Sequence, residues 1–145
     1  MRAKSPASSP LHVEPAPGKA PKPAPRGRRG VLGRKGEDLA VEAFREAGLR
    51  VLERNWRCRA GEIDLIAEDG RGTTLVVCEV KTRRGEGFGR PAEAVTVRKQ
   101  ARLRLLASVF LSTQSRYWET VRFDVVAVSF GPEGLRVDHR PGAFV

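Results

Sequence analysis

Two carboxylates and a lysine stand out in this sequence because they interrupt segments that are otherwise apolar. Asp64 follows Ile63, and Glu79 and Lys81 come directly after the apolar run at residues 75–78. A charge buried in such a segment is costly unless it is paired or serves a purpose. Carboxylate oxygens are the ligands that hard divalent cations such as Mg²⁺ prefer. The combination therefore indicates a candidate metal site.

The segments that carry these residues are predicted to be the two arms of a β-hairpin, residues 61–81. Its centre, Asp69-Gly70-Arg71-Gly72, is the strongest turn signal in the chain. If the turn centres on its last two residues, Asp64 faces Glu79 directly. If all four residues form the loop, the two carboxylates are diagonal neighbours. Either register brings them together on one face with Lys81, at Cβ separations of ~5 Å when opposed and ~7–8 Å when diagonal.

Two carboxylates at such distances repel each other unless a positive charge lies between them. A divalent cation would meet that need, and Lys81 would add a second positive charge beside it. The alternative is an exposed cluster that forms ordinary cross-strand ion pairs. The apolar surroundings favour the metal site, and the residues alone leave both interpretations open.

A helix is predicted from residue 33 to residue 47, with Gly48 as its C-terminal stop. Its apolar stripe consists of Ala40, Val41, Phe44 and Ala47. Glu37 falls within this stripe. A carboxylate in a first helical turn commonly interacts with the helix dipole, which is one interpretation. Joined to the hairpin, the other is favoured: Glu37 points across the sheet at the same cation.

A second helix is predicted from an N-cap at Thr96 to about residue 112. Its apolar stripe consists of Leu103, Leu106 and Phe110. Lys99 lies in the first turn in line with this stripe, and Gln100 lies at the stripe's edge. We therefore expect Lys99 to point at the sheet, toward an acidic or phosphate partner. A lysine that snorkels out of the core is the alternative.

Further basic residues gather in sequence near the proposed site. Arg83, Arg84 and Arg90 lie in a glycine-rich segment that follows Lys81, and Arg98 lies on the exposed side of the second helix. Their charge suits the phosphates of a nucleic acid, and loops commonly carry binding residues. A solvated surface loop is the alternative for this segment.

Length and composition limit the classes of protein to be considered. A chain of 145 residues has the length of a single domain. Its formal charge of +10 indicates a polyanionic partner. Residues 1–30 hold seven of the ten prolines and seven Lys or Arg against one acidic residue. They are predicted to form a disordered basic tail before a domain at residues 31–145. No apolar run is long enough to span a bilayer and no secretory signal is present, so a cytoplasmic location is expected.

Two cysteines, Cys58 and Cys78, are too few for a disulfide framework. Three more strands are predicted, at residues 49–56, 121–130 and 135–138, and Asp124 in the second of them is expected to be structural. With the hairpin, these strands make a sheet of about five strands beside two main helices. The fold class is therefore α+β, or α/β.

This constellation resembles the PD-(D/E)XK, or restriction-endonuclease-like, superfamily, and more closely the YraN-like family of bacterial proteins. The resemblance covers roughly residues 31–128 and rests on these motifs: Gly33-x-x-Gly36-Glu37, Gly61-Glu-Ile-Asp-Leu-Ile66, Val77-Cys-Glu-Val-Lys81, Phe88-Gly89 and the helix that bears Lys99. It implies an endonuclease-like core with a mixed sheet and a central hairpin. Cys78 stands where an aromatic or aliphatic residue is more usual, on the face away from the acidic residues.

The resemblance also implies roles for individual residues. Asp64 and Glu79, with the carbonyl of Val80, would hold Mg²⁺ or Mn²⁺, and Glu37 would orient the cluster or help to hold a second ion. Lys81 would align and activate the attacking water, with Lys99 or Gln100 in support. The implied function is a metal-dependent nuclease that hydrolyses phosphodiester bonds in DNA.

Branched DNA is one implied substrate, as for Holliday-junction resolvases, and a symmetric homodimer is the matching assembly because such enzymes cut two strands. Two other functions stay open. One is a nucleic-acid-binding module that keeps the fold without cleavage, and the other is an interaction protein that uses its basic surface to bind another protein.

Overall fold

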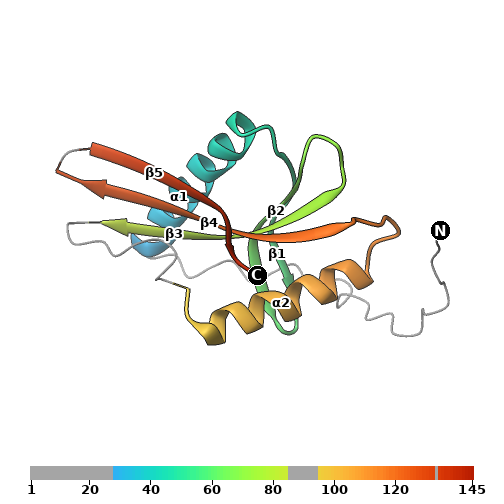
Figure 1. The fold of residues 1–145 in the computed structure, drawn as a ribbon. Helices are drawn as coiled ribbons and strands as arrows, with labels where there is room; N and C mark the ends of the chain where they lie inside the picture. The colour runs from blue at the N-terminus through green and yellow to red at the C-terminus, as the bar shows by residue number, and fades with distance from the viewer. Residues whose placement is uncertain (1–27, 85–94, 133) are drawn as a thin grey trace.

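One mixed β-sheet with a helix on each face makes up the described part of the chain (Figure 1). The computed structural model describes residues 28–84, 95–132 and 134–145. The elements in chain order are α1 (Arg28–Glu46), β1 (Arg50–Cys58), β2 (Gly61–Glu68), β3 (Thr74–Arg84), α2 (Val97–Ser112), β4 (Thr120–Gly131) and β5 (Gly134–Phe144). This is the α+β arrangement that was predicted, with a mixed five-stranded sheet and two main helices.

The strands lie in the sheet in chain order, from β1 to β5. Neighbouring strands are antiparallel except β3 and β4, which are parallel. Parallel neighbours need a long crossover connection, and α2 lies within the one that joins β3 to β4. The chain therefore has to carry α2 across one face of the sheet.

Two hydrophobic cores lie on the two faces of the sheet. On one face, Ala40, Val41 and Phe44 of α1 pack against residues such as Leu65 and Cys78. On the other face, Leu103, Leu106 and Phe110 of α2 pack against residues that include Ile66 and Val77. The predicted stripe of α2 and that of α1, apart from Ala47, are thereby buried, and Cys78 packs in the core on the α1 side.

The register of the hairpin is the first of the two predicted. Leu65 pairs with Cys78, and the ladder continues to Glu68 and Leu75. The ladder ends at Leu65 and Cys78, so Asp64 and Glu79 are the next residues of the two strands, at the point where the strands part. The pairing is fixed by the hydrophobic pattern, because a slip of one residue would move every apolar side chain to the other face.

Several predicted boundaries differ from those observed. Helix α1 begins at Arg28, so residues 28–30, assigned above to the tail, form its first turn. Arg and Leu are good helix formers, and they extend the helix ahead of the glycine that had set its predicted start. Ala47 is exposed because α1 ends at Glu46. The disorder predicted for the rest of the tail, like the turn predicted at residues 91–94, lies outside the described residues.

Strand β5 is longer than the pattern at residues 135–138 indicated, and it reaches Phe144. A register shift between Phe123 and Val125 of β4 accommodates the extra length. At that point the fully buried Asp124 accepts hydrogen bonds from the Arg122 guanidinium (2.8 and 2.9 Å) and the Gly142 N–H (3.0 Å), and His139 Nε2 lies 2.8 Å from it. Asp124 is therefore structural, as expected.

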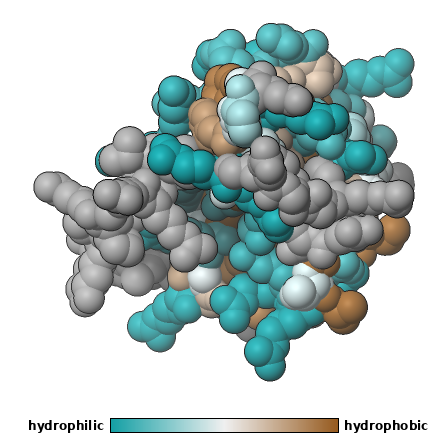
Figure 2. Space-filling view, turned by 90° about the vertical axis from the view of Figure 1, so that its left-hand side faces the viewer, coloured by the Kyte–Doolittle hydropathy of each residue, from teal (hydrophilic) through white to brown (hydrophobic). Residues whose placement is uncertain are grey.

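None of the helices in the three described ranges is both long and apolar enough to cross a membrane. Figure 2 shows the left-hand side of the view in Figure 1, and the residues coloured there are mostly hydrophilic. Only a few hydrophobic side chains reach this surface, because most large apolar residues are committed to the two cores.

Candidate active site

Asp64 lies at a fork in the sheet, where β2 leaves β3. The β2–β3 ladder extends to the pair Leu65 and Cys78, and beyond it the Asp64 carboxylate accepts the Val80 N–H through Oδ2 at 2.8 Å. Where the two strands part, the Asp64 side chain therefore replaces the backbone of β2 as the acceptor for an N–H group of β3. This hydrogen bond fixes the Asp64 carboxylate beside residue 80.

Asp64 is half-buried, and its carboxylate lies near other acids. Burial raises its pKa from 3.8 to about 7, and the negative charge of Glu79 adds to the shift. The Val80 N–H works in the opposite direction by stabilising the ionised form, whereas Glu37 and Glu62 raise the pKa further. The site therefore favours a positive species next to Asp64.

Glu79 is buried, with 7% of its surface exposed, and two lysines converge on it. Lys99 Nζ lies 3.0 Å and Lys81 Nζ lies 3.5 Å from the same oxygen, Oε2. Lys81 comes from the same strand two residues away, while Lys99 reaches across from the first turn of α2. Thr96 caps that turn by accepting the Lys99 N–H at 3.1 Å, which fixes where the lysine begins.

Glu37 approaches the site from α1, on the other side of the sheet from α2. It is half-buried, and its Oε1 accepts a hydrogen bond of 2.8 Å from Asn55 Nδ2 of β1. The preceding residue, Gly36, is buried and lies so close to Thr82 of β3 that an added Cβ would overlap Thr82 Oγ1. The absence of a side chain at residue 36 lets α1 approach the strand that carries Glu79.

The structure thus brings together four predicted residues, Asp64, Glu79, Lys81 and Lys99, with Glu37 near enough to raise the pKa of Asp64. Val80 joins them through its N–H, while the metal-binding role expected for its carbonyl stays a prediction. Gln100 does not join them. Its Nε2 donates to the Val95 carbonyl (3.2 Å) and its Oε1 accepts from Arg104 (3.4 Å), so it is bound to its own helix.

Three of the four predicted nucleic-acid-binding arginines lie on the strand and the helix that carry the site lysines. Arg83 and Arg84 are exposed at the end of β3, and Arg98 is exposed in the first turn of α2. Arg90 lies outside the described residues. The basic groups that can be placed therefore flank both elements that carry the site lysines.

The possible ligand atoms at the site are oxygen atoms, which is the type of ligand that a hard cation prefers. The carboxylates of Asp64 and Glu79, with Glu37 nearby, offer oxygen atoms of the type that Mg²⁺ and Mn²⁺ prefer. Among the residues that the structure describes, however, no group of three or more acidic, histidine or cysteine side chains is placed to hold a metal ion. The donor atoms fit such an ion by their chemistry, and their side chains would have to move closer together to bind it.

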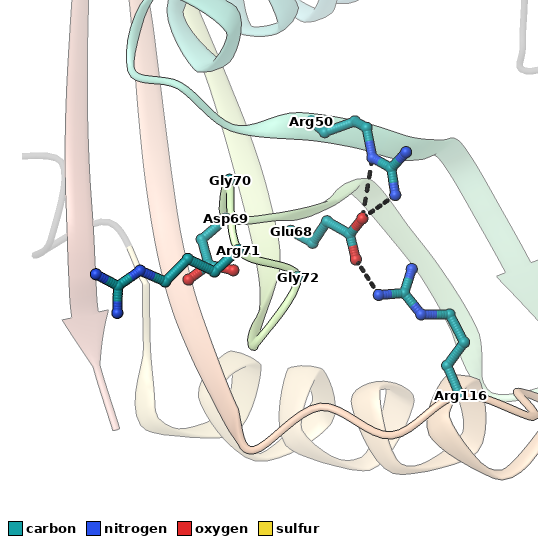
Figure 3. A pocket seen from close by; sticks show the side chains of 7 residues that line it. All are labelled: Arg50, Glu68, Asp69, Gly70, Arg71, Gly72 and Arg116. Atoms are coloured by element: carbon teal, nitrogen blue, oxygen red, sulfur yellow. Dashed lines mark hydrogen bonds and ion pairs between the residues drawn. The ribbon is translucent and has the colours of Figure 1, made fainter.

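A pocket of about 380 Å³ lies at the opposite end of the hairpin, around its turn (Figure 3). Its central acid, Glu68, is 2% exposed and binds Arg50, Arg116 (2.7 Å) and the Trp118 indole N–H (3.0 Å). Figure 3 shows Arg71 pointing away from this group. Because Glu68 and the two arginines satisfy one another, we interpret this pocket as a structural clamp and place the chemistry at Asp64.

Asn55 near the site, and the residues of the clamp at the other end of the hairpin, were absent from the sequence-based prediction. Asn55 was missed although asparagine is unfavourable in a strand interior, and that was the available signal. Arg50, Glu68 and Arg116 were also missed, because their meeting depends on elements distant in the sequence. The importance of Gly36 to helix packing is visible only once α1 is docked on β3.

Two solved structures are similar to this chain at a low level. A repair endonuclease from Pyrococcus abyssi has a TM-score of 0.37 and 25% identity, over 67% of this chain and 37% of that one. Pyrococcus furiosus SfsA in complex with Ca²⁺ has a TM-score of 0.31 and 12% identity, over 77% and 62% of the two chains. Both TM-scores are low.

Relatives by sequence are much closer. A UPF0102 protein of Rhodococcus opacus is 58% identical over 101 residues, which is 70% of this chain and 84% of that protein. One of Nocardia farcinica is 51% identical over 120 residues, or 81% and 92% of the two chains. The family model matches residues 36–128, a stretch that includes Glu37, Asp64, Glu79, Lys81 and Lys99. The chain belongs to the uncharacterised protein family UPF0102.

Proposed function

We propose that this protein is a metal-dependent nuclease that hydrolyses phosphodiester bonds in DNA, with Mg²⁺ or Mn²⁺ as its cofactor. The observation that carries the proposal is the meeting of Asp64, bound to the Val80 N–H, with the neighbouring Glu79, on which two lysines converge. Burying Glu79 and half-burying the other charges is costly, and the packing of the sheet does not require it. A reaction that needs oxygen ligands and ammonium groups side by side gives it a purpose.

In this proposal, Asp64 and Glu79 hold the cation, with Glu37 and the Val80 carbonyl available as further oxygen ligands. A bound divalent ion supplies charge stabilisation at the phosphate and helps to form the nucleophile. The ammonium of Lys81 is the group on β3 available to orient the attacking water. Lys99 holds the Glu79 carboxylate from α2 by binding its Oε2, and this contact keeps that oxygen fixed while the substrate binds.

The proposed partner is a nucleic acid, in particular DNA. The formal charge of +10 supports a polyanion, and Arg83, Arg84 and Arg98 are exposed on β3 and α2, the elements that carry the site lysines. Helix α2 adds to this because it contains four basic residues and no acidic one. Such groups bind phosphates without reading sequence, so structure-selective binding, for example to branched DNA, fits this surface better than sequence-specific recognition.

The test is cleavage of linear and branched DNA by the purified chain with Mg²⁺ or Mn²⁺ and with EDTA. Asp64→Ala should lose at least about 100-fold in rate, the scale of a catalytic group removed. This variant is expected to fold, because it removes a buried charge whose pKa is already raised. Glu62→Gln is the matched control, since Glu62 is an exposed acid of the same strand that pairs with Arg57 at 2.9 Å.

A second candidate is a module that binds nucleic acid without cutting it. Glu79 can be neutralised by Lys99 and Lys81 with no cation present, and that observation favours this candidate. It predicts salt-dependent DNA binding that is equal in the wild type and in Asp64→Ala, with no cleavage that depends on metal. The nuclease proposal fails if the wild type and Asp64→Ala share the same trace activity.

A further inference from the structure

Asn55 has an unusual backbone conformation directly across from Asp64. Among the described residues it is the only one other than glycine with a positive φ, 51°. The β1–β2 ladder pairs Arg54 with Leu65 and Trp56 with Ile63, and it passes over the position between them, where Asn55 faces Asp64. Left-handed backbone is rare for residues other than glycine, and asparagine adopts it more readily than most.

Both strands change sides of the sheet at this point. Residues two apart in a regular strand share a face. Yet Leu65 packs in the α1 core, whereas Ile63 packs in the α2 core. On β1, Arg54 pairs with Asp38 of α1 (2.6 Å), whereas Trp56 packs on Phe110 of α2 at 5.5 Å between ring centroids. The left-handed residue accommodates this change of face, and Asp64 lies within it.

The side chain of Asn55 makes a second link to the site. Its Nδ2 donates to Glu37 Oε1 at 2.8 Å, a contact between residues 18 positions apart. Glu37 directly follows Gly36, which packs against Thr82 of β3, one residue beyond Lys81, so the carboxylate that Asn55 holds lies at the part of β3 that carries the site. One residue therefore bends the strand pair at the first acid and restrains a second acid from α1.

We propose that Asn55 is a positioning residue that orients Glu37 toward the cation held by Asp64 and Glu79. This inference rests on the proposed nuclease function and extends it to a residue with no direct part in the chemistry. Asn55 acts through its amide on Glu37, while its left-handed backbone maintains the bend at Asp64. Partners of this kind typically change metal affinity or activity by about 10- to 100-fold when removed.

The two contributions of Asn55 are separable by substitution. Asn55→Gly keeps the left-handed backbone available and removes only the amide, because glycine adopts positive φ at no steric cost. Glu53→Gly is the matched control, since it introduces the same residue at an exposed position two residues earlier on β1. Thermal melts show that each variant is folded at the temperature of the other measurements.

The experiment measures Mn²⁺ affinity of the full chain by calorimetry, and DNA cleavage in parallel, for Asn55→Gly in two backgrounds. With Glu37 present, Asn55→Gly should weaken Mn²⁺ binding about 10-fold. With Glu37→Ala, the same substitution should have an effect of about twofold or less, because its partner is gone. Glu53→Gly should leave Mn²⁺ affinity unchanged in both backgrounds.

Equal losses in the two backgrounds, or no loss in either, would overturn the inference. If Asn55→Gly does not fold, Asn55→Asp replaces it, since aspartate also tolerates left-handed backbone but offers Glu37 no N–H donor. The melting temperature of the Asn55→Asp variant should then rise when Glu37→Gln is added, because the substitution removes the repulsion between the two carboxylates. An unchanged melting temperature in this double variant overturns the inference. Should the wild type bind no Mn²⁺ at all, the nuclease proposal fails first, which distinguishes the two failures.

Discussion

Lys99 Nζ lies 3.0 Å from Glu79 Oε2, and this contact joins the first turn of α2 to the strand that carries Glu79 and Lys81. The two residues are 20 positions apart, and the segment between them includes the glycine-rich stretch after β3. A buried carboxylate with ammonium groups on one oxygen keeps its other oxygen for a further ligand. The α2 lysine is therefore part of the site and not a snorkelling surface residue.

The two lysines and Gln100 should differ in their effect on cleavage. Lys81→Met should reduce kcat/KM by about 100-fold or more, the scale expected for a group that handles the attacking water. Lys99→Met should cost about tenfold, because Lys99 acts through Glu79. Gln100→Ala should change little, since its side chain is bound to Val95 and Arg104. Steady-state kinetics on one DNA substrate check this order, and a loss for Gln100→Ala equal to that for Lys99→Met would contradict it.

Asp64→Asn should stabilise the metal-free protein at alkaline pH. The pKa of Asp64 is raised by burial to about 7, so the folded state binds a proton more tightly than the unfolded chain does. Wild-type stability therefore falls as pH rises from about 4 to about 7, and Asn removes this loss while keeping an acceptor for the Val80 N–H. The gain should be roughly 2–4 kcal/mol near pH 8 and close to zero near pH 4. Urea unfolding in EDTA measures it, and a destabilised Asn variant at both pH values would refute it.

The hairpin and its register could be predicted from the sequence because their causes are local. The turn residues Asp69-Gly70-Arg71-Gly72 and the two-residue period of the arms restrict the pairing to two registers, and the observed register, with Leu65 opposite Cys78, is one of them. The same holds for Lys99, whose position follows from the helical period and the N-cap at Thr96. Chemistry that depends on one turn or one periodic face is visible in the residues themselves.

The rest of the site depends on how distant elements meet. The sequence puts Gln100 beside Lys99, but only the packed helix shows that its amide turns back to Val95. Asn55 gives no periodic signal, because its role comes from left-handed backbone and a contact with α1. The extension of α1 back to Arg28 was likewise hidden by Gly33, which marks a helix start in isolation.

Glu68→Gln should destabilise the fold without affecting metal binding. Burial alone would raise the pKa of Glu68, but hydrogen bonds from Arg116, Arg50 and Trp118 outweigh it and lower the pKa from 4.5 to about 2. This stabilisation is present above the unfolded value and is lost as pH falls through the folded one. The substitution should cost about 1–3 kcal/mol near pH 7 and progressively less toward pH 2.

Denaturant unfolding of wild type and Glu68→Gln at several pH values measures this difference. Arg45→Gln is a suitable control, because Arg45 takes part in an exposed ion pair with Glu42 and such pairs contribute little. A cost that stays constant from pH 7 to pH 2 would show that the clamp works by packing and not by charge.

Gly36→Ala should push α1 away from β3 and thereby weaken the site as well as the fold. The added Cβ would overlap Thr82 Oγ1 and lie 3.2 Å from Cγ2 and 3.3 Å from Cβ of the same residue. Thr is β-branched and has few alternative rotamers, so relief requires movement of the helix that carries Glu37. The expected cost is about 1–3 kcal/mol, together with weaker Mn²⁺ binding.

Thr82→Ala in the same chain removes the overlapping atoms, and the double variant should recover most of both losses. Gly33→Ala is the control, because nothing lies within 4 Å of a Cβ built there, and alanine in an open helical position should stabilise by up to about 1 kcal/mol. Unfolding curves and Mn²⁺ calorimetry are measured on the wild type, Gly36→Ala, the double variant and Gly33→Ala. Together they separate the steric effect from helix propensity. If Thr82→Ala rescues stability but not Mn²⁺ affinity, the position of Glu37 does not depend on the contact between α1 and β3.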